Sequence, residues 1–168
     1  MPIDPLAPDE HAAGPLALHP FSLNRLRLYR RFAVPRATLF DALHDAALMP
    51  DWLGTPDRPL REARVALHPG GSTRLSWGPG EGVTLTYQDV ELPGRTVHSE
   101  VGDTDTTGGP VLVTTLVLPW AGGSLLTREF WYQDEAARDA LLASDMAATL
   151  EAGYARLEAL LGTRAKAA

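Results

Sequence analysis

The sequence contains no cysteine and a single lysine, and each shortage excludes a class of chemistry. Without thiols the chain can form no disulfide, no cysteine nucleophile, no iron–sulfur cluster and no thiolate zinc site. Lys166 is the only lysine, so 14 of the 15 basic residues are arginines. We therefore do not expect catalysis through a Schiff base, which needs a lysine amine in the active site.

Positive charge and long apolar runs are also scarce. The chain has 21 acidic and 15 basic residues, a formal net charge of −6, which argues against binding to nucleic acid. No run of about 18 apolar residues is present, so we expect no membrane span. The N-terminal segment has neither the basic start nor the apolar stretch of a signal peptide. These absences predict a cytoplasmic protein.

The remaining composition is that of one globular domain with an N-terminal extension. The chain has 168 residues, of which 45% are hydrophobic and 21% charged. Residues 1–24 hold five of the 14 prolines and no basic residue. We predict a proline-rich arm over residues 1–24 and a domain over 25–168. The arm is either loose, or its Leu16, Leu18 and Phe21 pack on the domain or on a partner subunit of a possible homodimer.

The order of predicted elements indicates an α+β fold with an antiparallel sheet. Residues 26–34 alternate as a strand does, and short helices are expected over 37–45 and 46–53. Six strand-like segments follow, divided by glycine and proline turns; they cover residues 61–68, 72–77, 83–91, 95–101, 111–118 and 124–132. Strands and helices do not alternate, which excludes a doubly wound parallel sheet.

One long helix is predicted at the end of the chain. It spans residues 135–162, with Asp134 as its N-cap and Gly162 as its C-cap, and Ser144 marks a possible break. The fold that accommodates these elements is a curved sheet of about seven antiparallel strands wrapped around the long helix.

Six short segments, in this order, resemble one known family. The segments are Leu26 to Pro35, Leu39 to Asp45 with Trp52-Leu53-Gly54, Pro69-Gly70-Gly71, Tyr87-Gln88-Asp89-Val90, Gly122-Gly123-Ser124, and Met146 with Arg156-Leu157. They are similar to the helix-grip fold of the START-like (SRPBCC) superfamily. The most similar branch is the bacterial homologues of the C-terminal domain of the Hsp90 ATPase activator. The sequence departs from that branch at Asp89, where glutamate is usual, at Ala66, where an acidic residue is common, and at His68, where arginine is common.

The resemblance implies a cavity between the sheet and the long helix. Many members of the superfamily bind apolar or amphipathic small molecules there, some are cyclases, and the eukaryotic relative stimulates a chaperone ATPase. We therefore expect non-catalytic binding of a hydrophobic or amphipathic small molecule. The alternatives are a protein-interaction or stress-linked chaperone-regulating module and a cyclase-like enzyme. The predicted ligand-binding residues are Arg30, Trp52, Trp77, Tyr87, Phe130, Met146 and Gly153.

Arg30 is the most informative of these residues. It falls on the same period-two face as Leu28, a face that we expect to point inward. A buried guanidinium needs a partner, because burying an unpaired charge is costly. Two interpretations stay open. Arg30 forms an internal ion pair with a residue such as Asp89, Glu100 or Glu129, or it binds an anionic ligand.

Two other positions also leave alternatives open. Gly153 lies inside the predicted helix, where glycine costs about 1 kcal/mol relative to alanine, so it provides either room for a ligand or a close approach of helix to sheet. His98 faces either the cavity or solvent. The five histidines form no metal-binding pair, and no serine lies in a G-x-S-x-G motif. We expect no metal and no cofactor, and the sequence favours a binding protein over an enzyme.

Overall fold

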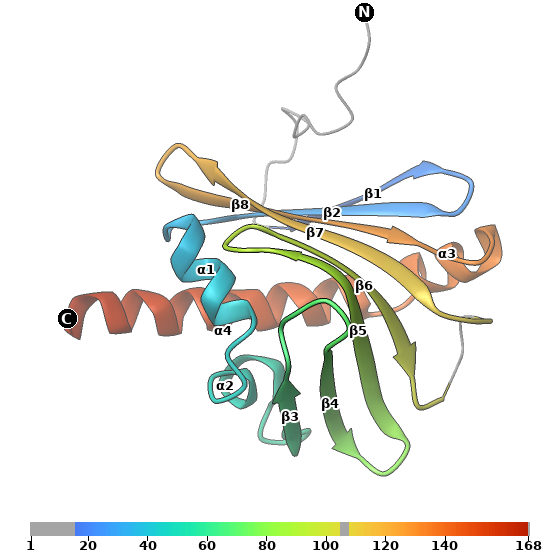
Figure 1. The fold of residues 1–168 in the computed structure, drawn as a ribbon, viewed down its shortest axis with the longest axis horizontal. Coiled ribbons are helices and arrows are strands. Elements are labelled where there is room, and N and C mark those ends of the chain that lie inside the picture. The colour runs from blue at the N-terminus through green and yellow to red at the C-terminus, as the bar shows by residue number, and fades with distance from the viewer. Residues whose placement is uncertain (1–15, 105–107, 168) are drawn as a thin grey trace, which may run out of the picture.

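The fold, seen in a computed structural model that describes residues 16–104 and 108–167, has eight strands and four helices (Figure 1). The first part of the chain forms β1 (Leu16–Ser22), β2 (Arg25–Phe32), α1 (Arg36–Leu43), α2 (Met49–Leu53), β3 (Glu62–Val65) and β4 (Ser72–Gly78). The second part forms β5 (Glu81–Glu91), β6 (Arg95–Gly102), β7 (Val111–Trp120), β8 (Gly123–Trp131), α3 (Glu135–Leu142) and α4 (Met146–Ala167).

All eight strands belong to one sheet in the order β1-β2-β8-β7-β6-β5-β4-β3, and every neighbouring pair is antiparallel. The chain from β3 to β8 is a meander, and β2 extends this open sheet by pairing with β8. Figure 1 shows α4 running along one side of the curved sheet, with α1 and α2 beside it. This arrangement confirms the predicted α+β helix-grip fold, with one strand more than expected.

The additional strand, β1, lies in the segment that we predicted as an arm. Its register pairs Leu16 with Arg30 and Leu18 with Leu28, so it extends the sheet at one edge. Leu16 and Leu18 pack against the core, as in the second of the two interpretations of the arm. Pro20 is tolerated because an edge strand has one side that needs no ladder hydrogen bonds. The sheet thus begins before residue 25, and residues 1–15 of the predicted arm lie outside the described residues.

The predicted C-terminal helix is divided at Ser144, as the sequence suggested, but it ends later than predicted. The Ser144 hydroxyl donates to the carbonyl of Leu141 at 2.6 Å and accepts from the Met146 amide at 3.2 Å, so it ends α3 and begins α4. Gly162 is not a C-cap, because α4 continues to Ala167 through residues that favour helix. The N-cap is confirmed: the amide of Ala137 donates to the Asp134 carboxylate at 2.8 Å.

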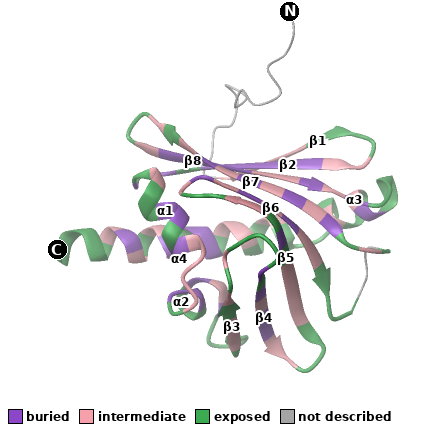
Figure 2. Ribbon diagram, viewed as in Figure 1, coloured by how far each residue is buried: buried purple, intermediate pink, exposed green. Residues whose placement is uncertain are grey.

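The core lies between the concave face of the sheet and the helices. Along β7 every second residue from Val111 to Val117 is buried, which is the alternation of a strand with one face on the core. Leu26 and Leu28 of β2, Phe40 of α1 and Leu157 of α4 are fully buried on the same side. Figure 2 shows buried segments on the central strands and on the helices α1 and α4. This core frames the cavity described next.

Candidate functional site

A cavity of about 690 Å³ lies between the sheet and the helices α2 and α4. The sheet contributes Leu18 of β1 and residues of β4 to β8, and all four helices contribute residues as well. Most of the wall is apolar. The larger apolar side chains are Leu43, Met49, Trp52, Trp77, Val83, Leu85, Tyr87, Leu126, Phe130, Met146, Leu150 and Tyr154.

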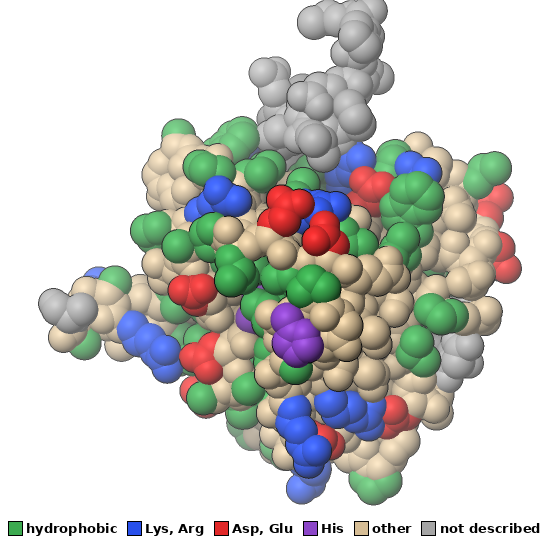
Figure 3. Space-filling model, viewed as in Figure 1, with side chains coloured by type: hydrophobic (Ala, Val, Ile, Leu, Met, Phe, Trp, Pro, Cys, Tyr) green, Lys and Arg blue, Asp and Glu red, His purple; other side chains and the backbone are tan. Residues whose placement is uncertain are grey.

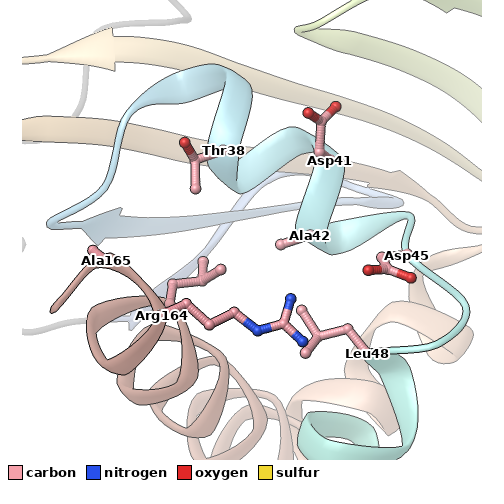
Figure 4. A pocket seen from close by; sticks show the side chains of 8 residues that line it. Thr38, Asp41, Ala42, Asp45, Leu48, Arg164 and Ala165 are labelled. Carbon is pink, nitrogen blue, oxygen red and sulfur yellow. The ribbon is translucent and has the colours of Figure 1, made fainter. Parts of the chain in front are cut away.

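A second depression lies between α1 and the last turns of α4. Figure 4 shows Asp41 on α1 and Arg164 on α4 on opposite sides of it. The side chains of Thr38, Asp41 and Arg164 are exposed. Because its polar groups are solvated, this depression is a weaker candidate for a ligand site than the larger cavity.

The structure brings six of the seven predicted site residues together around the cavity. Trp52 lies on α2, and its ring stacks on that of Tyr154 of α4 with the ring centroids 5.9 Å apart. Trp77 on β4 donates its indole N–H to the carbonyl of Leu53 at 3.2 Å. All six of these residues line the cavity, namely Trp52, Trp77, Tyr87, Phe130, Met146 and Gly153.

Arg30 is the exception. It faces inward as predicted and is only 2% exposed, but it does not line the cavity. Its Nε and Nη2 donate to Glu151 at 3.0 and 3.2 Å, and its Nη1 donates to Glu158 at 3.1 Å. The two glutamates are seven residues apart, or two turns, and so share one face of α4. Arg30 thus ties the helix to the sheet.

The ion-pair interpretation of Arg30 therefore fits, but its three suggested partners were wrong. Each of them pairs with a different arginine: Asp89 with Arg95, Glu129 with Arg27, and Glu100 with Arg128. The sequence could not show that α4 presents two carboxylates at this point of the sheet, since docking of the helix decides it.

Gly153 allows α4 to approach α2 closely. A Cβ atom at this position would lie 3.2 Å from the backbone oxygen of Trp52. The same oxygen accepts hydrogen bonds from Nε and Nη2 of Arg156, at 3.2 and 2.8 Å. The close-approach interpretation is therefore supported, with α2 rather than the sheet as the neighbour.

One end of the cavity is polar. There, Nη2 of Arg128 on β8 lies 2.6 Å from Oε1 of Glu100 on β6, and Nε2 of His98 donates to the same oxygen at 3.0 Å. We call Glu100, Arg128 and His98 the polar end. His98 thus faces inward and is 3% exposed, which answers the open question about its orientation.

The charges of the polar end are stable at neutral pH. Burial by itself would raise the pKa of Glu100, but the nearby Arg128 and the hydrogen bond from His98 outweigh it and lower the pKa to about 2. Burial opposes the charge of Arg128 as well, yet Glu100 and the Tyr154 hydroxyl raise its pKa. Glu100 and Arg128 therefore remain a charged pair throughout the neutral range.

Neutral polar groups surround this pair. Nδ1 of His44 lies 2.8 Å from the carbonyl of Phe40, so Nδ1 carries the hydrogen, and burial lowers the pKa of the ring. His44 is then uncharged at pH 7 with Nε2 as an acceptor. Burial also raises the pKa of Tyr87 and of Tyr132, where Glu100 adds to the effect. Both phenols stay protonated.

Sequence reasoning missed Arg128 and His44 as cavity residues. Arg128 alternates with Leu126 and Phe130 along β8, the same signal that marked Arg30. His44 follows α1 directly, and no sequence pattern distinguishes it from a solvated residue. Over residues 16–104 and 108–167, no three acidic or histidine side chains gather as a metal would require, and no helix there could cross a membrane.

The fold is similar to those of several solved structures. A structure from Rhodobacter sphaeroides shares 37% identity and a TM-score of 0.82, and the match covers 89% of this chain and 99% of that one. A Mycobacterium smegmatis protein shares 18% identity and a TM-score of 0.74 over 89% and 99% of the two chains. An HSP90 activator from Plasmodium falciparum shares 16% identity and a TM-score of 0.53 over 65% and 73%.

These last two likenesses show the fold alone, because their identities are low. No curated protein matches the chain. The family described as "Activator of Hsp90 ATPase homolog 1-like protein" matches residues 33–162, a range that begins directly after β2 and ends within α4. The chain therefore belongs to the family of Activator of Hsp90 ATPase homolog 1-like proteins.

Proposed function

We propose that the protein binds a hydrophobic or amphipathic small molecule in the cavity between the sheet and α4, without changing it chemically. The observation that carries this proposal is the cavity itself, with its volume of about 690 Å³. Well-packed protein cores leave few voids larger than a water molecule. Pockets for small molecules, in contrast, commonly measure about 300–1,000 Å³.

The wall of the cavity suits such a ligand. Trp52 and Tyr154 stack on one side, and Phe130 and Tyr132 stack on another with their centroids 6.4 Å apart. These rings offer flat apolar surfaces that fit an alkyl chain or a ring system. A few polar groups at one end would orient the molecule, which is the usual design of a small-molecule site.

The ionisation of the polar groups favours binding over catalysis. A general acid or base works best when its pKa is near the working pH. Glu100, with a pKa of about 2, is a weak base, and Arg128 and Tyr132 hold their protons more firmly than usual. Burial lowers the pKa of His44, so its unprotonated Nε2 is a weaker base than a solvated imidazole.

No specific observation favours the chaperone-regulating alternative. The large apolar side chains exposed among the described residues, such as Leu23, Leu92 and Val101, lie at separate turns and strand ends. Figure 3 shows hydrophobic side chains in scattered groups on the face in view. A docking surface would instead gather them into one patch.

The first experiment is native mass spectrometry of the protein purified from its own host, to find a molecule that co-purifies. We expect the bound mass to be absent in Leu150→Trp, which fills space at a half-buried position in the cavity wall. Leu160→Trp is the matched control, because Leu160 is half-buried on the same helix outside the cavity. A mass that persists in Leu150→Trp, or no binding by any apolar probe, would contradict the proposal.

A further inference from the structure

The polar end of the cavity contains equal and opposite charges. Glu100 and Arg128 contribute one negative and one positive charge, 2.6 Å apart. Glu100 is the only carboxylate among the described residues that line the cavity. Because their opposite charges cancel, neither side chain has an unpaired charge to offer a ligand.

The other arginines near the cavity are also engaged. Arg58 lies at the exposed rim, 3.3 Å from Glu81 and above the ring of Trp77. Arg156 directs Nε and Nη2 to the carbonyl of Trp52. Arg30, the residue that the sequence suggested for an anion, is outside the cavity with two glutamates. At the polar end itself no guanidinium is left for a carboxylate, whereas Arg156 bonds only to a neutral carbonyl elsewhere in the wall.

Uncharged hydrogen-bonding groups, in contrast, are plentiful beside the pair. Nε2 of His44 is an acceptor, and the Tyr132 hydroxyl is a protonated group held close to Glu100. The Tyr87 hydroxyl lies 2.7 Å from Oγ1 of Thr73 and has capacity for a further bond. Such groups match an uncharged polar group of a ligand. A hydroxyl or an amide would both donate and accept hydrogen bonds here, and a carbonyl would accept them.

A charged ligand group would be penalised here. A carboxylate at the polar end would meet Glu100 with no free cation to balance it, and an ammonium group would meet Arg128 in the same way. Either would lose its hydration for an unpaired position in a low-dielectric site. An uncharged polar group exchanges its hydrogen bonds to water for equivalent bonds to the wall.

We infer that the cavity selects an amphiphile whose polar end is uncharged, such as an alcohol, ketone or amide, over the corresponding acid or amine. This inference rests on the proposed function and narrows its ligand class. The balanced pair formed by Glu100 and Arg128 is the selecting element, because it supplies strong hydrogen bonding without net charge.

The test compares three probes that share one alkyl chain: 1-decanol, decanoate and decylamine. Binding is measured by titration calorimetry at pH 7, with the fluorescence of the cavity residues Trp52 and Trp77 as a second signal. For the wild-type protein we expect 1-decanol to bind at least about tenfold more tightly than either charged probe. The charged probes give up their hydration without gaining a charged partner at the polar end, and this loss accounts for the ratio.

Two variants then test the cause. Glu100→Gln leaves Arg128 without its carboxylate, and we expect the ratio of decanoate to 1-decanol affinity to rise by about tenfold or more. Glu100→Gln combined with Arg128→Gln restores neutrality and should restore the preference for 1-decanol. Glu91→Gln is the matched control, since Glu91 is exposed and paired with Arg95 outside the cavity; its ratio should equal that of the wild type.

The outcomes separate this inference from the function on which it rests. If decanoate or decylamine binds the wild-type protein as tightly as 1-decanol, the inference is wrong and the proposed function stands. If decanoate binds the wild-type protein tightly but no longer binds Arg156→Gln, the carboxylate is held by Arg156 and not at the polar end. If none of the three probes binds and no molecule co-purifies, the proposed function fails and the inference with it. If Glu100→Gln does not fold, the affinity ratio of 1-decanol to the charged probes in the wild-type protein still decides whether the inference holds.

Discussion

Arg30→Met should destabilise the fold and leave ligand preference unchanged. Methionine keeps the apolar length of the side chain but removes the guanidinium that joins β2 to Glu151 and Glu158 of α4. The two glutamates would then lie on the same face of α4 with no cation between them. The expected result is a weaker attachment of α4 to the sheet.

The magnitude follows from burial. Removing one partner of a fully buried ion pair costs about 3–5 kcal/mol, because the other charge is left without compensation. Here Arg30 is 2% exposed but the side chains of Glu151 and Glu158 are 30% and 33% exposed. Since both carboxylates can regain part of their hydration, we expect the loss of unfolding free energy to lie near the lower limit, at about 2–3 kcal/mol.

Urea denaturation followed by circular dichroism measures this change. Arg31→Met is the matched control, since Arg31 is the next residue on the same strand and is exposed above the Trp120 ring; its effect should stay within about 0.5 kcal/mol. Adding Glu151→Gln and Glu158→Gln to Arg30→Met should recover most of the lost stability, because no unpaired charge then remains.

The reasoning would be refuted by a variant of unchanged stability whose preference among 1-decanol, decanoate and decylamine has shifted. That result would mean that Arg30 contacts the ligand and that its pairing with α4 is incidental. Loss of stability with all three affinities in their wild-type ratio is the expected outcome.

Three further predictions concern stability. Gly162→Ala should stabilise the protein by about 0.5–1 kcal/mol, because nothing lies within 4 Å of the added Cβ, whereas Gly153→Ala should destabilise it by about 1 kcal/mol, because its Cβ would press on the Trp52 oxygen; equal effects in urea denaturation would contradict this. The pKa of Glu100 is lowered from 4.5 to about 2, so its contribution of about 3 kcal/mol is present above pH 4.5 and is lost as the pH falls toward 2. Glu100→Gln should flatten that part of the pH–stability curve, and an unchanged curve would refute the assignment. Asp134→Ala removes the N-cap of α3 and should lower the free energy of unfolding by about 1 kcal/mol in the same assay. An unchanged free energy of unfolding would contradict the cap.

Much of the fold could be predicted from local pattern. The glycine and proline turns separated the strands from β3 to β8, and the alternation along β2 placed Arg30 on the buried face. Position along these elements was also enough to bring Trp77, Phe130 and Met146 to the cavity wall. β1 was missed as a strand because Pro20 interrupts it, and proline is compatible with a strand only at a sheet edge.

The sequence by itself determined which side chains share one face of a strand or helix, because the periods of these elements are properties of the local backbone. Only the tertiary structure decided what each inward group meets. Arg30 and Glu151 are 121 residues apart in the chain, and Glu100 and Arg128 are 28 apart. Their pairing depends on the register of β6 to β8 and on where α4 docks, which are set by packing across the whole core. For this reason the sequence indicated that Arg30 is buried, but only the structure showed that Glu100 and Arg128 are the charged pair facing the cavity.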